Sequence, residues 1–312
     1  MATRGHVVRT LGACVIVAGG RTVALAQTPV VVKVGAGITE GNAQVFYAID
    51  QGFFKKSGVD VDLTLLRSGG PIMEAIVAGQ LQAGSGNSVS LGSAVLRGIP
   101  LVVVAPGQIW VAGSPAAAIV VAADSAIKSM KDLAGKTVGV TSLRNVGELA
   151  FRTYFDQAGV DASGVKFVEF APLQVAEAVA SGRVAAGTLV DPELSNAIAT
   201  GKVRRLLGAY DAISKLFYLT VWFAASDWLA KNKELGKRFA DGIIQGGMWG
   251  EANREQARLV LAKYTKVMGA LSTTRFGNHL DPALLQAIWD PAYKYKIYNA
   301  PVRAADYCWD GR

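Results

Sequence analysis

Four short stretches of the chain carry polar side chains of the kind that hold a small solute. Each follows an apolar run with the length of a β-strand and precedes a segment with helical spacing. Ligands of open α/β sheets bind beyond the carboxyl ends of the strands, so these stretches are the candidate binding loops. They are 36–42 with Thr39 and Asn42, 86–90 with Asn87, Ser88 and Ser90, 141–147 with Thr141, Ser142, Arg144 and Asn145, and 189–193 with Asp191 and Glu193.

The third loop offers groups that bind an anion. A helix is expected to begin near Asn145, and the free N–H groups at a helix start attract negative charge. Arg144 would add a planar guanidinium that can hold a sulfonate or carboxylate through two hydrogen bonds. Helices also begin near Asn42 and Ser88, so the first two loops share this property. The alternative is that the Ser, Thr and Asn side chains only cap these helices and that Arg144 is a solvated loop charge.

Three further residues are candidates for the walls of the site. Asp191 precedes a proline, and its alternative roles are ligand contact, helix capping and closure of the site. Trp110 and Tyr218 lie in apolar segments, and aromatic walls would favour an organic ligand over a bare inorganic anion. Side chains of the strand expected at 217–224 alternate between two faces, and one of those faces must be core.

The elements that position these loops occur twice. Residues Glu74–Ser85 read EAIVAGQLQAGS and residues Glu177–Thr188 read EAVASGRVAAGT. Periodicity predicts the order β-α-β-α-β around each copy. The expected elements are 30–35, 42–52, 59–65, 71–78 and 81–85 in the first unit, and 137–140, 146–158, 165–170, 173–180 and 184–190 in the second. This alternation implies parallel sheets with right-handed crossovers, hence two lobes of similar build with a cleft between them.

The chain is expected to cross between the lobes twice, near 106–117 and near 210–226. We therefore assign residues 27–110 and 225–312 to the first lobe and residues 111–224 to the second. The last part of the chain has good helix formers and is expected to pack back on the first lobe. The uncharged stretch 99–123 is cut by three prolines and two glycines, which favours two buried strands over a membrane-spanning helix.

Residues 1–26 have the order of a secretory signal peptide: a basic start, an apolar stretch at 11–20 and the cleavage motif Ala24-Leu25-Ala26. Export with cleavage after Ala26 is expected, and acylation of Cys14 is the alternative. Removal of this segment takes away three arginines and no acids, so the net charge falls from +8 to +5. Cys308 is then the one cysteine left, which excludes a disulfide within the chain.

Composition and residue content limit the function classes. With 51% hydrophobic and 18% charged residues, the chain can fold around a sizeable core, and its scattered basic residues do not predict nucleic-acid binding. His279 and Cys308 cannot supply the three ligands of a zinc site, so neither metal nor cofactor is expected. A dinucleotide fingerprint at 35–40 is a further alternative, although the charge of Glu40 would repel a pyrophosphate.

Residues 46–61, FYAIDQGFFKKSGVDV, resemble the signature of periplasmic solute-binding proteins that serve ABC importers of the sulfonate, taurine and nitrate type. These proteins share a fold with the pyrimidine-precursor binding proteins of thiamine supply. Residues 131–140, KDLAGKTVGV, resemble the family's entry to its second lobe, and Pro301-Val302 resembles its C-terminal motif. The family's usual Asp in the repeated segment is Ala83 in this chain.

The resemblance covers roughly residues 30–305 and implies a type II periplasmic-binding-protein fold. This is a two-lobed α/β fold in which each lobe is a β-α-β-α-β sheet with helices on both faces. It implies a ligand in the cleft and an ABC permease as partner. Together with the anion-binding groups of the loops, we expect a small, anionic organic ligand captured by hinge closure, without catalysis, by a periplasmic monomer. The alternatives are an exported sensory or ligand-interaction domain of the same fold, or a nucleotide- or pyrimidine-handling enzyme, for which the chain lacks a histidine cluster.

Overall fold

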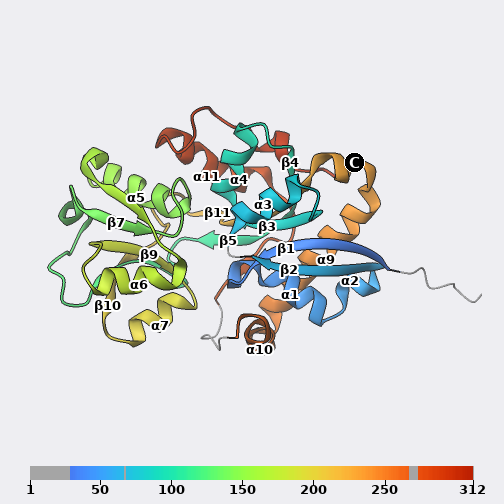
Figure 1. The fold of residues 1–312 in the computed structure, drawn as a ribbon, viewed down its shortest axis with the longest axis horizontal. Helices are drawn as coiled ribbons and strands as arrows, with labels where there is room; N and C mark the ends of the chain where they lie inside the picture. The colour runs from blue at the N-terminus through green and yellow to red at the C-terminus, as the bar shows by residue number, and fades with distance from the viewer. Residues whose placement is uncertain (1–28, 67, 267–272, 312) are drawn as a thin grey trace, which may run out of the picture.

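The structure, a computed structural model, describes residues 29–66, 68–266 and 273–311. Figure 1 shows two lobes side by side, with strands running between them. Each lobe is built on a five-stranded sheet, and a third sheet of three strands joins the lobes. The expected signal segment 1–26, including Cys14, lies outside the described residues.

The first-lobe sheet has the strand order β2-β1-β3-β12-β4. β1 pairs in parallel with β2 and β3, as the alternation of strands and helices predicts, whereas β12 runs antiparallel to β3 and β4. The strands are β1 (Val30–Gly37), β2 (Val59–Leu66), β3 (Ala83–Asn87), β4 (Leu101–Pro106) and β12 (Thr220–Ala225). The helices are η1 (Glu40–Asn42), α1 (Ala43–Asp50), α2 (Phe53–Lys56), α3 (Gly69–Val77), α4 (Ser88–Leu96), α8 (Ser226–Lys231), α9 (Lys233–Ala252), α10 (Arg254–Thr265), α11 (Pro282–Lys294) and η4 (Ala304–Tyr307).

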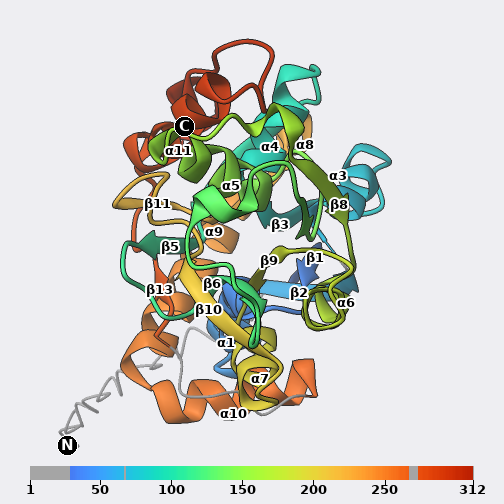
Figure 2. The same cartoon turned by 90° about the vertical axis from the view of Figure 1, so that its left-hand side faces the viewer.

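The second-lobe sheet has the order β10-β6-β9-β7-β8 and repeats the parallel arrangement of β2, β1 and β3 in β8, β7 and β9. Figure 2 looks onto this lobe, with α5 on one side of the sheet and α6 and α7 on the other. Its strands are β6 (Ala117–Ala122), β7 (Thr137–Val140), β8 (Lys166–Glu169), β9 (Ala186–Val190) and β10 (Val203–Gly208). Its helices are η2 (Met130–Leu133), α5 (Val146–Gln157), η3 (Ala162–Gly164), α6 (Pro172–Ala180) and α7 (Glu193–Ala199).

The repeated Ala-Gly pair of the sequence has a packing reason. Gly84 in β3 and Gly187 in β9 occupy matching places, each paired with a glycine of the neighbouring parallel strand. A Cβ atom at Gly187 would lie 2.6 Å from Val175 Cγ1 of α6, and one at Gly84 would collide with Ile72 of α3. In both lobes the absent side chain therefore lets a helix pack closely on the sheet.

The lobes are joined by two short strands, β5 (Gln108–Val111) and β11 (Leu216–Tyr218), which pair antiparallel. β13 (Arg275–Phe276) adds to the other edge of β5. These strands lie at the two crossings expected from the sequence. This connection has the geometry of a two-strand hinge, because the two five-stranded sheets are separate and, of the described strands, only β5 and β11 run between the lobes.

One expected boundary is corrected by the sheet pairing. Residues 220–224 were assigned to the second lobe, but β12 is hydrogen-bonded between β3 and β4 of the first sheet. The chain thus returns to the first lobe directly after β11. Alternation of apolar residues predicts a strand here but does not determine which sheet the strand joins.

Four clusters of buried side chains fill the molecule, one on each face of each large sheet. The largest extends past the hinge, since it holds Trp110 and Tyr218 together with Leu149 of α5 and Trp289 of α11. No helix within the described ranges is both long and apolar enough to cross a membrane.

Candidate functional site

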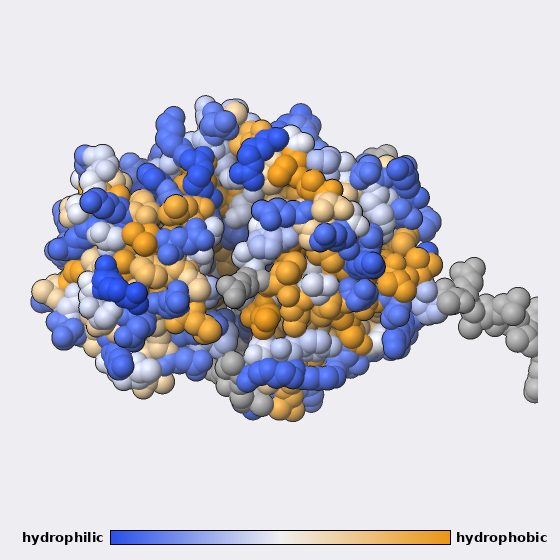
Figure 3. Space-filling model, in the orientation of Figure 1, coloured by the Kyte–Doolittle hydropathy of each residue, from blue (hydrophilic) through white to orange (hydrophobic). Residues whose placement is uncertain are grey.

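The four predicted loops lie at the carboxyl ends of β1, β3, β7 and β9. In parallel strands these ends share one edge of the sheet, so each lobe presents two of the loops at a single edge. Figure 3 shows a furrow between the two lobes on the face of Figure 1. The candidate site is this interlobe cleft.

In the first lobe, the polar side chains of the first loop are bonded to one another. The Asn42 amide nitrogen donates to the Thr39 hydroxyl at 2.7 Å, and the Ser85 hydroxyl donates to the Asn42 amide oxygen at 2.5 Å. Asn42 is only 7% exposed. Thr39, which is partly exposed, is the member of this network with surface for a solute.

The second loop is tied to the hinge. Asn87 caps α4, because its side chain accepts hydrogen bonds from the N–H groups of Val89 and Ser90. The Ser88 hydroxyl donates to the Tyr218 carbonyl at 2.6 Å, and Ser88 is fully buried. Ser88 therefore has no surface for a solute, and the structure assigns it to holding β11, in place of the expected ligand contact.

The expected aromatic walls are also buried. Trp110 is 1% exposed and packs edge-on against Tyr210 at a centroid distance of 5.0 Å. Tyr218 is 0% exposed; its hydroxyl donates to the His279 carbonyl at 2.8 Å, and burial raises its pKa to about 12. Both rings stabilise the hinge core and do not line the cleft. For Tyr218 the sequence could not show this, because residues that cover it come from the distant C-terminal part of the chain.

In the second lobe, Asn145 caps α5 through the N–H groups of Gly147 and Glu148, and its amide donates to Thr141 at 3.3 Å. Arg144 is exposed and has a left-handed backbone, with φ of 54°. Its backbone N–H donates to the Glu148 carboxylate at 2.8 Å, and its guanidinium donates to the carbonyl of Ile297. Thr141, Ser142 and Arg144 are thus brought together, with the guanidinium directed at a first-lobe carbonyl.

The fourth loop carries two acids with different environments. The Asp191 carboxylate accepts hydrogen bonds from the Ser195 N–H at 3.0 Å and from the Ser195 hydroxyl at 2.7 Å, which fits the capping alternative. Burial raises the pKa of Glu193, and the neighbouring charge of Asp191 raises it as well. Glu193 was not among the main candidates from the sequence, yet it lines a cavity.

That cavity, of about 40 Å³, lies at the carboxyl edge of the second-lobe sheet. It is lined by Thr141, Pro172, Thr188, Val190, Glu193 and Tyr210, among others. The sequence does not predict Thr188 or Tyr210 as site residues. The repeat offered a signal for Thr188, which matches Ser85, whereas Tyr210 lies outside the repeated unit.

A larger cavity of about 520 Å³ lies against β5 and β13, away from the strand ends. Its two arginines have partners: Arg275 pairs with Glu251 at 3.0 Å, and Arg254 donates to the Thr274 carbonyl at 3.3 Å. Within residues 29–66, 68–266 and 273–311 no group of three His, Cys, Asp or Glu side chains could hold a metal ion.

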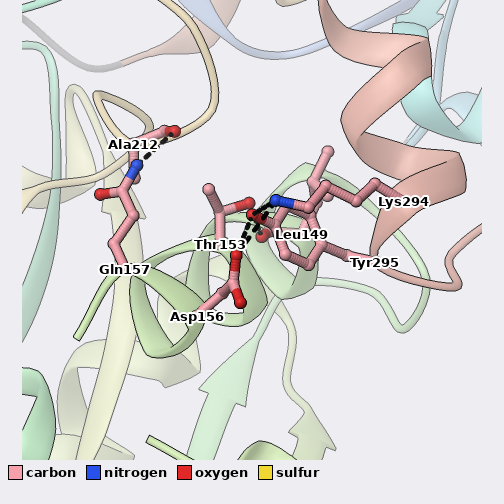
Figure 4. Close-up of polar contacts among 7 residues, drawn as sticks. All are labelled: Leu149, Thr153, Asp156, Gln157, Ala212, Lys294 and Tyr295. Carbon is pink, nitrogen blue, oxygen red and sulfur yellow. Dashed lines mark hydrogen bonds and ion pairs between the residues drawn. The ribbon is translucent and has the colours of Figure 1, made fainter. Parts of the chain in front are cut away.

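A polar cluster links the lobes beside the hinge. Figure 4 shows Lys294 and Tyr295, at the end of α11, meeting Asp156 of α5. The Tyr295 hydroxyl donates to the Asp156 carboxylate at 2.7 Å and the Lys294 ammonium lies 3.1 Å from it. These hydrogen bonds hold the pKa of Asp156 below its ordinary value. The pairs are solvent-exposed, so they orient α5 against α11 more than they stabilise the fold.

Known proteins resemble this chain in sequence and in fold. A "Putative binding protein" of Brucella abortus is 27% identical over 250 residues, which cover 76% of this chain and 72% of that protein. The periplasmic aliphatic sulphonate binding protein SsuA from Escherichia coli superposes with a TM-score of 0.71 at 21% identity, covering 90% of this chain and 92% of the other. The alkanesulfonate-binding protein SsuA from Xanthomonas axonopodis pv. citri, bound to MOPS, gives 0.73 at 16% identity, with 91% and 99% covered.

The structural likeness confirms the expected two-lobed fold of periplasmic binding proteins. The sequence profile described as "NMT1/THI5 like" matches residues 41–257, which run from the first binding loop through the second lobe into α10. The chain belongs to the NMT1/THI5-like family.

Proposed function

We propose that the protein is an extracytoplasmic solute-binding protein that captures a small organic solute in the interlobe cleft and delivers it to an ABC permease. The observation that carries the proposal is the pair of similar lobes, joined by β5 and β11, in which the carboxyl ends of the parallel strands share one edge of each sheet. Such a hinge allows the lobes to close on a ligand without chemistry. Family membership and the fold of the sulfonate-binding proteins support the same conclusion.

The proposal includes an anionic group on the solute, bound near Thr141, Ser142 and Arg144. Arg144 supports this because the residue is exposed and its guanidinium has a neutral carbonyl, that of Ile297, as partner, which a charged oxygen would replace favourably. Export to the periplasm and a monomeric state complete the proposal. Cleavage after Ala26 would leave Gln27 as the first residue, which mass spectrometry of protein from the native host can test.

A ligand screen tests the proposed function. The chain from residue 27 onward is heated with sulfonates, carboxylates, amines and pyrimidines. A ligand at a hundred times its Kd adds about 2.7 kcal/mol of stability, which corresponds to a rise in Tm of roughly 4–5 °C for a protein of this size. Turnover of the bound compound by the pure protein, or no binding from any class, would contradict the proposal.

The Arg144→Ala variant tests the anion site by calorimetric titration. Charge-assisted hydrogen bonds contribute roughly 1.5–3 kcal/mol, so affinity for an anionic ligand should fall by about tenfold to a hundredfold. Arg97→Ala is the matched control, because Arg97 is an exposed arginine at the end of α4 in the other lobe. Equal affinity in wild type and Arg144→Ala would remove Arg144 from the site.

A further inference from the structure

Beside the small second-lobe cavity, only part of the first-lobe hydrogen-bond network is repeated. In the first lobe, Ser85 on β3 donates to Asn42, the residue before α1, which in turn donates to Thr39. In the second lobe, Asn145 precedes α5 and donates to Thr141 at 3.3 Å, but its amide oxygen accepts from the N–H groups of the helix and not from the β9 hydroxyl. Thr188, which matches Ser85 in the repeat, makes no hydrogen bond through its hydroxyl to any described residue and lines the cavity.

The acids at this cavity give it a negative formal charge. Glu193 lines it, and no ion pair with Glu193 occurs in the described part of the chain. The nearest charge acting on Glu193 is the carboxylate of Asp191, which has the same sign. An anion placed here would meet both acids in a partly desolvated setting, where like charges repel strongly.

The remaining lining favours a hydrogen-bond donor. Thr141 and Thr188 offer hydroxyl oxygens, and Tyr210, which is 4% exposed, closes the inner side together with Val190. The cavity volume of about 40 Å³ is a few times the volume that one water molecule requires. This volume suits an amino group and its attached carbon, but not a sulfonate group with its adjacent carbon atoms. A carboxylate with hydroxyl acceptors around it is complementary to an N–H-bearing cation.

We infer that this cavity receives a nitrogen donor of the solute, a primary amine or a protonated ring nitrogen, with the Glu193 carboxylate as its acceptor. The inference rests on the proposed function and narrows its ligand class to amino-bearing solutes. An anionic group of the same solute lies toward Arg144, and Glu193 sets the preference between an amine and its amine-free analogue. Thr188 positions the nitrogen through its unused hydroxyl.

Matched probe pairs test the inference by calorimetric titration of the chain from residue 27 onward. The pairs are 3-aminopropane-1-sulfonate with propane-1-sulfonate, 4-aminobutanoate with butanoate, and 3-aminopropan-1-ol with propan-1-ol. In at least one pair the wild type should prefer the amine by about tenfold to a hundredfold, which is the range for a charge-assisted hydrogen bond. Glu193→Gln should bring that ratio close to one while leaving the Kd of the amine-free member unchanged or improved.

Controls separate the possible outcomes. Glu177→Gln removes an exposed carboxylate of α6 in the same lobe and should keep the wild-type ratio. Thr188→Val, which keeps the side-chain shape, should lower the ratio by a smaller factor than Glu193→Gln. Two results refute this inference and leave the proposed function standing. One is that the probes bind and the preference for the amine is the same in Glu193→Gln as in wild type. The other is that wild type binds the amine-free members more tightly. Failure of every probe here and in the wider screen refutes the proposed function together with it.

Discussion

Replacing Gly187 with alanine tests whether close helix-to-sheet packing defines each lobe. The new Cβ atom would lie 2.6 Å from Val175 Cγ1, 3.1 Å from Val179 Cγ2 and 3.5 Å from the Gly139 carbonyl oxygen. Carbon atoms in good contact are about 3.5–4.0 Å apart, so the first contact is short by roughly 1 Å. Val175 cannot turn away easily, because a β-branched side chain on a helix has one strongly preferred rotamer.

The expected loss of stability follows from two opposing terms. Overpacking of a core costs about 1–3 kcal/mol, and the entropy lost by the unfolded chain on changing Gly to Ala returns roughly 0.4–1 kcal/mol. The net loss is therefore about 0–2.6 kcal/mol, with a central value of about 1.3 kcal/mol, which lowers Tm by roughly 2 °C and by no more than about 4 °C. Denaturant unfolding followed by circular dichroism measures it. Gly84→Ala should behave in the same way, since its Cβ would collide with Ile72.

A second substitution decides whether the collision is the cause. Combining Gly187→Ala with Val175→Ala removes the closest methyl group and leaves the Val179 contact at 3.1 Å, so in that background Gly187→Ala should cost clearly less than in the wild type. Gly70→Ala is the control, since a Cβ there has nothing within 4 Å and the backbone is helical. A loss of stability from Gly187→Ala that is as large in the Val175→Ala background as in the wild type would refute the packing argument.

Three further predictions concern the loops and the hinge. Asn145→Ala should destabilise the protein by about 0.5–2 kcal/mol in denaturant unfolding, because α5 loses its cap. Tyr218→Phe should cost about 1–3 kcal/mol in the same assay, since the Asp281 N–H and the His279 carbonyl lose a buried partner. The pKa of Glu193 is raised in the folded protein, so folding favours the protonated carboxyl group. The stability that this preference contributes is fully present below the ordinary glutamate pKa of about 4.3. It is lost as pH rises through the pKa of Glu193 in the folded state. Glu193→Gln should therefore be more stable than wild type at pH 7 and equal to it near pH 3, and equal stability at both pH values would contradict this reasoning.

The sequence predicted the parts of the fold that depend on local pattern. Alternating and helical spacing, with the repeat at 74–85 and 177–188, predicted both β-α-β-α-β units and two crossings between lobes. It misplaced 220–224, because the apolar alternation of β12 is the same whichever sheet accepts the strand. Pairing over more than a hundred residues of separation is a tertiary property that local spacing does not encode.

The positions of the candidate loops in the fold could be predicted better than the surroundings of their side chains. The position of a loop follows from strand direction, so Thr141 and the 189–193 loop could be placed at the cleft from the sequence. Whether Ser88 or Tyr218 is exposed depends on what covers it, and the covering segment, around 279–298, is distant in sequence. Tyr210 had no signal, since it reaches the cavity from a connection that the repeat does not include.

The cluster of buried side chains that passes the hinge has a thermodynamic consequence. Leu149 and Ala150 of α5 pack in the same core as Leu285 and Trp289 of α11, and Trp110 and Tyr218 connect them. Melting either lobe alone would expose apolar surface of the other, so the two lobes should unfold in one cooperative transition. In calorimetry this predicts a single peak whose van't Hoff and calorimetric enthalpies agree.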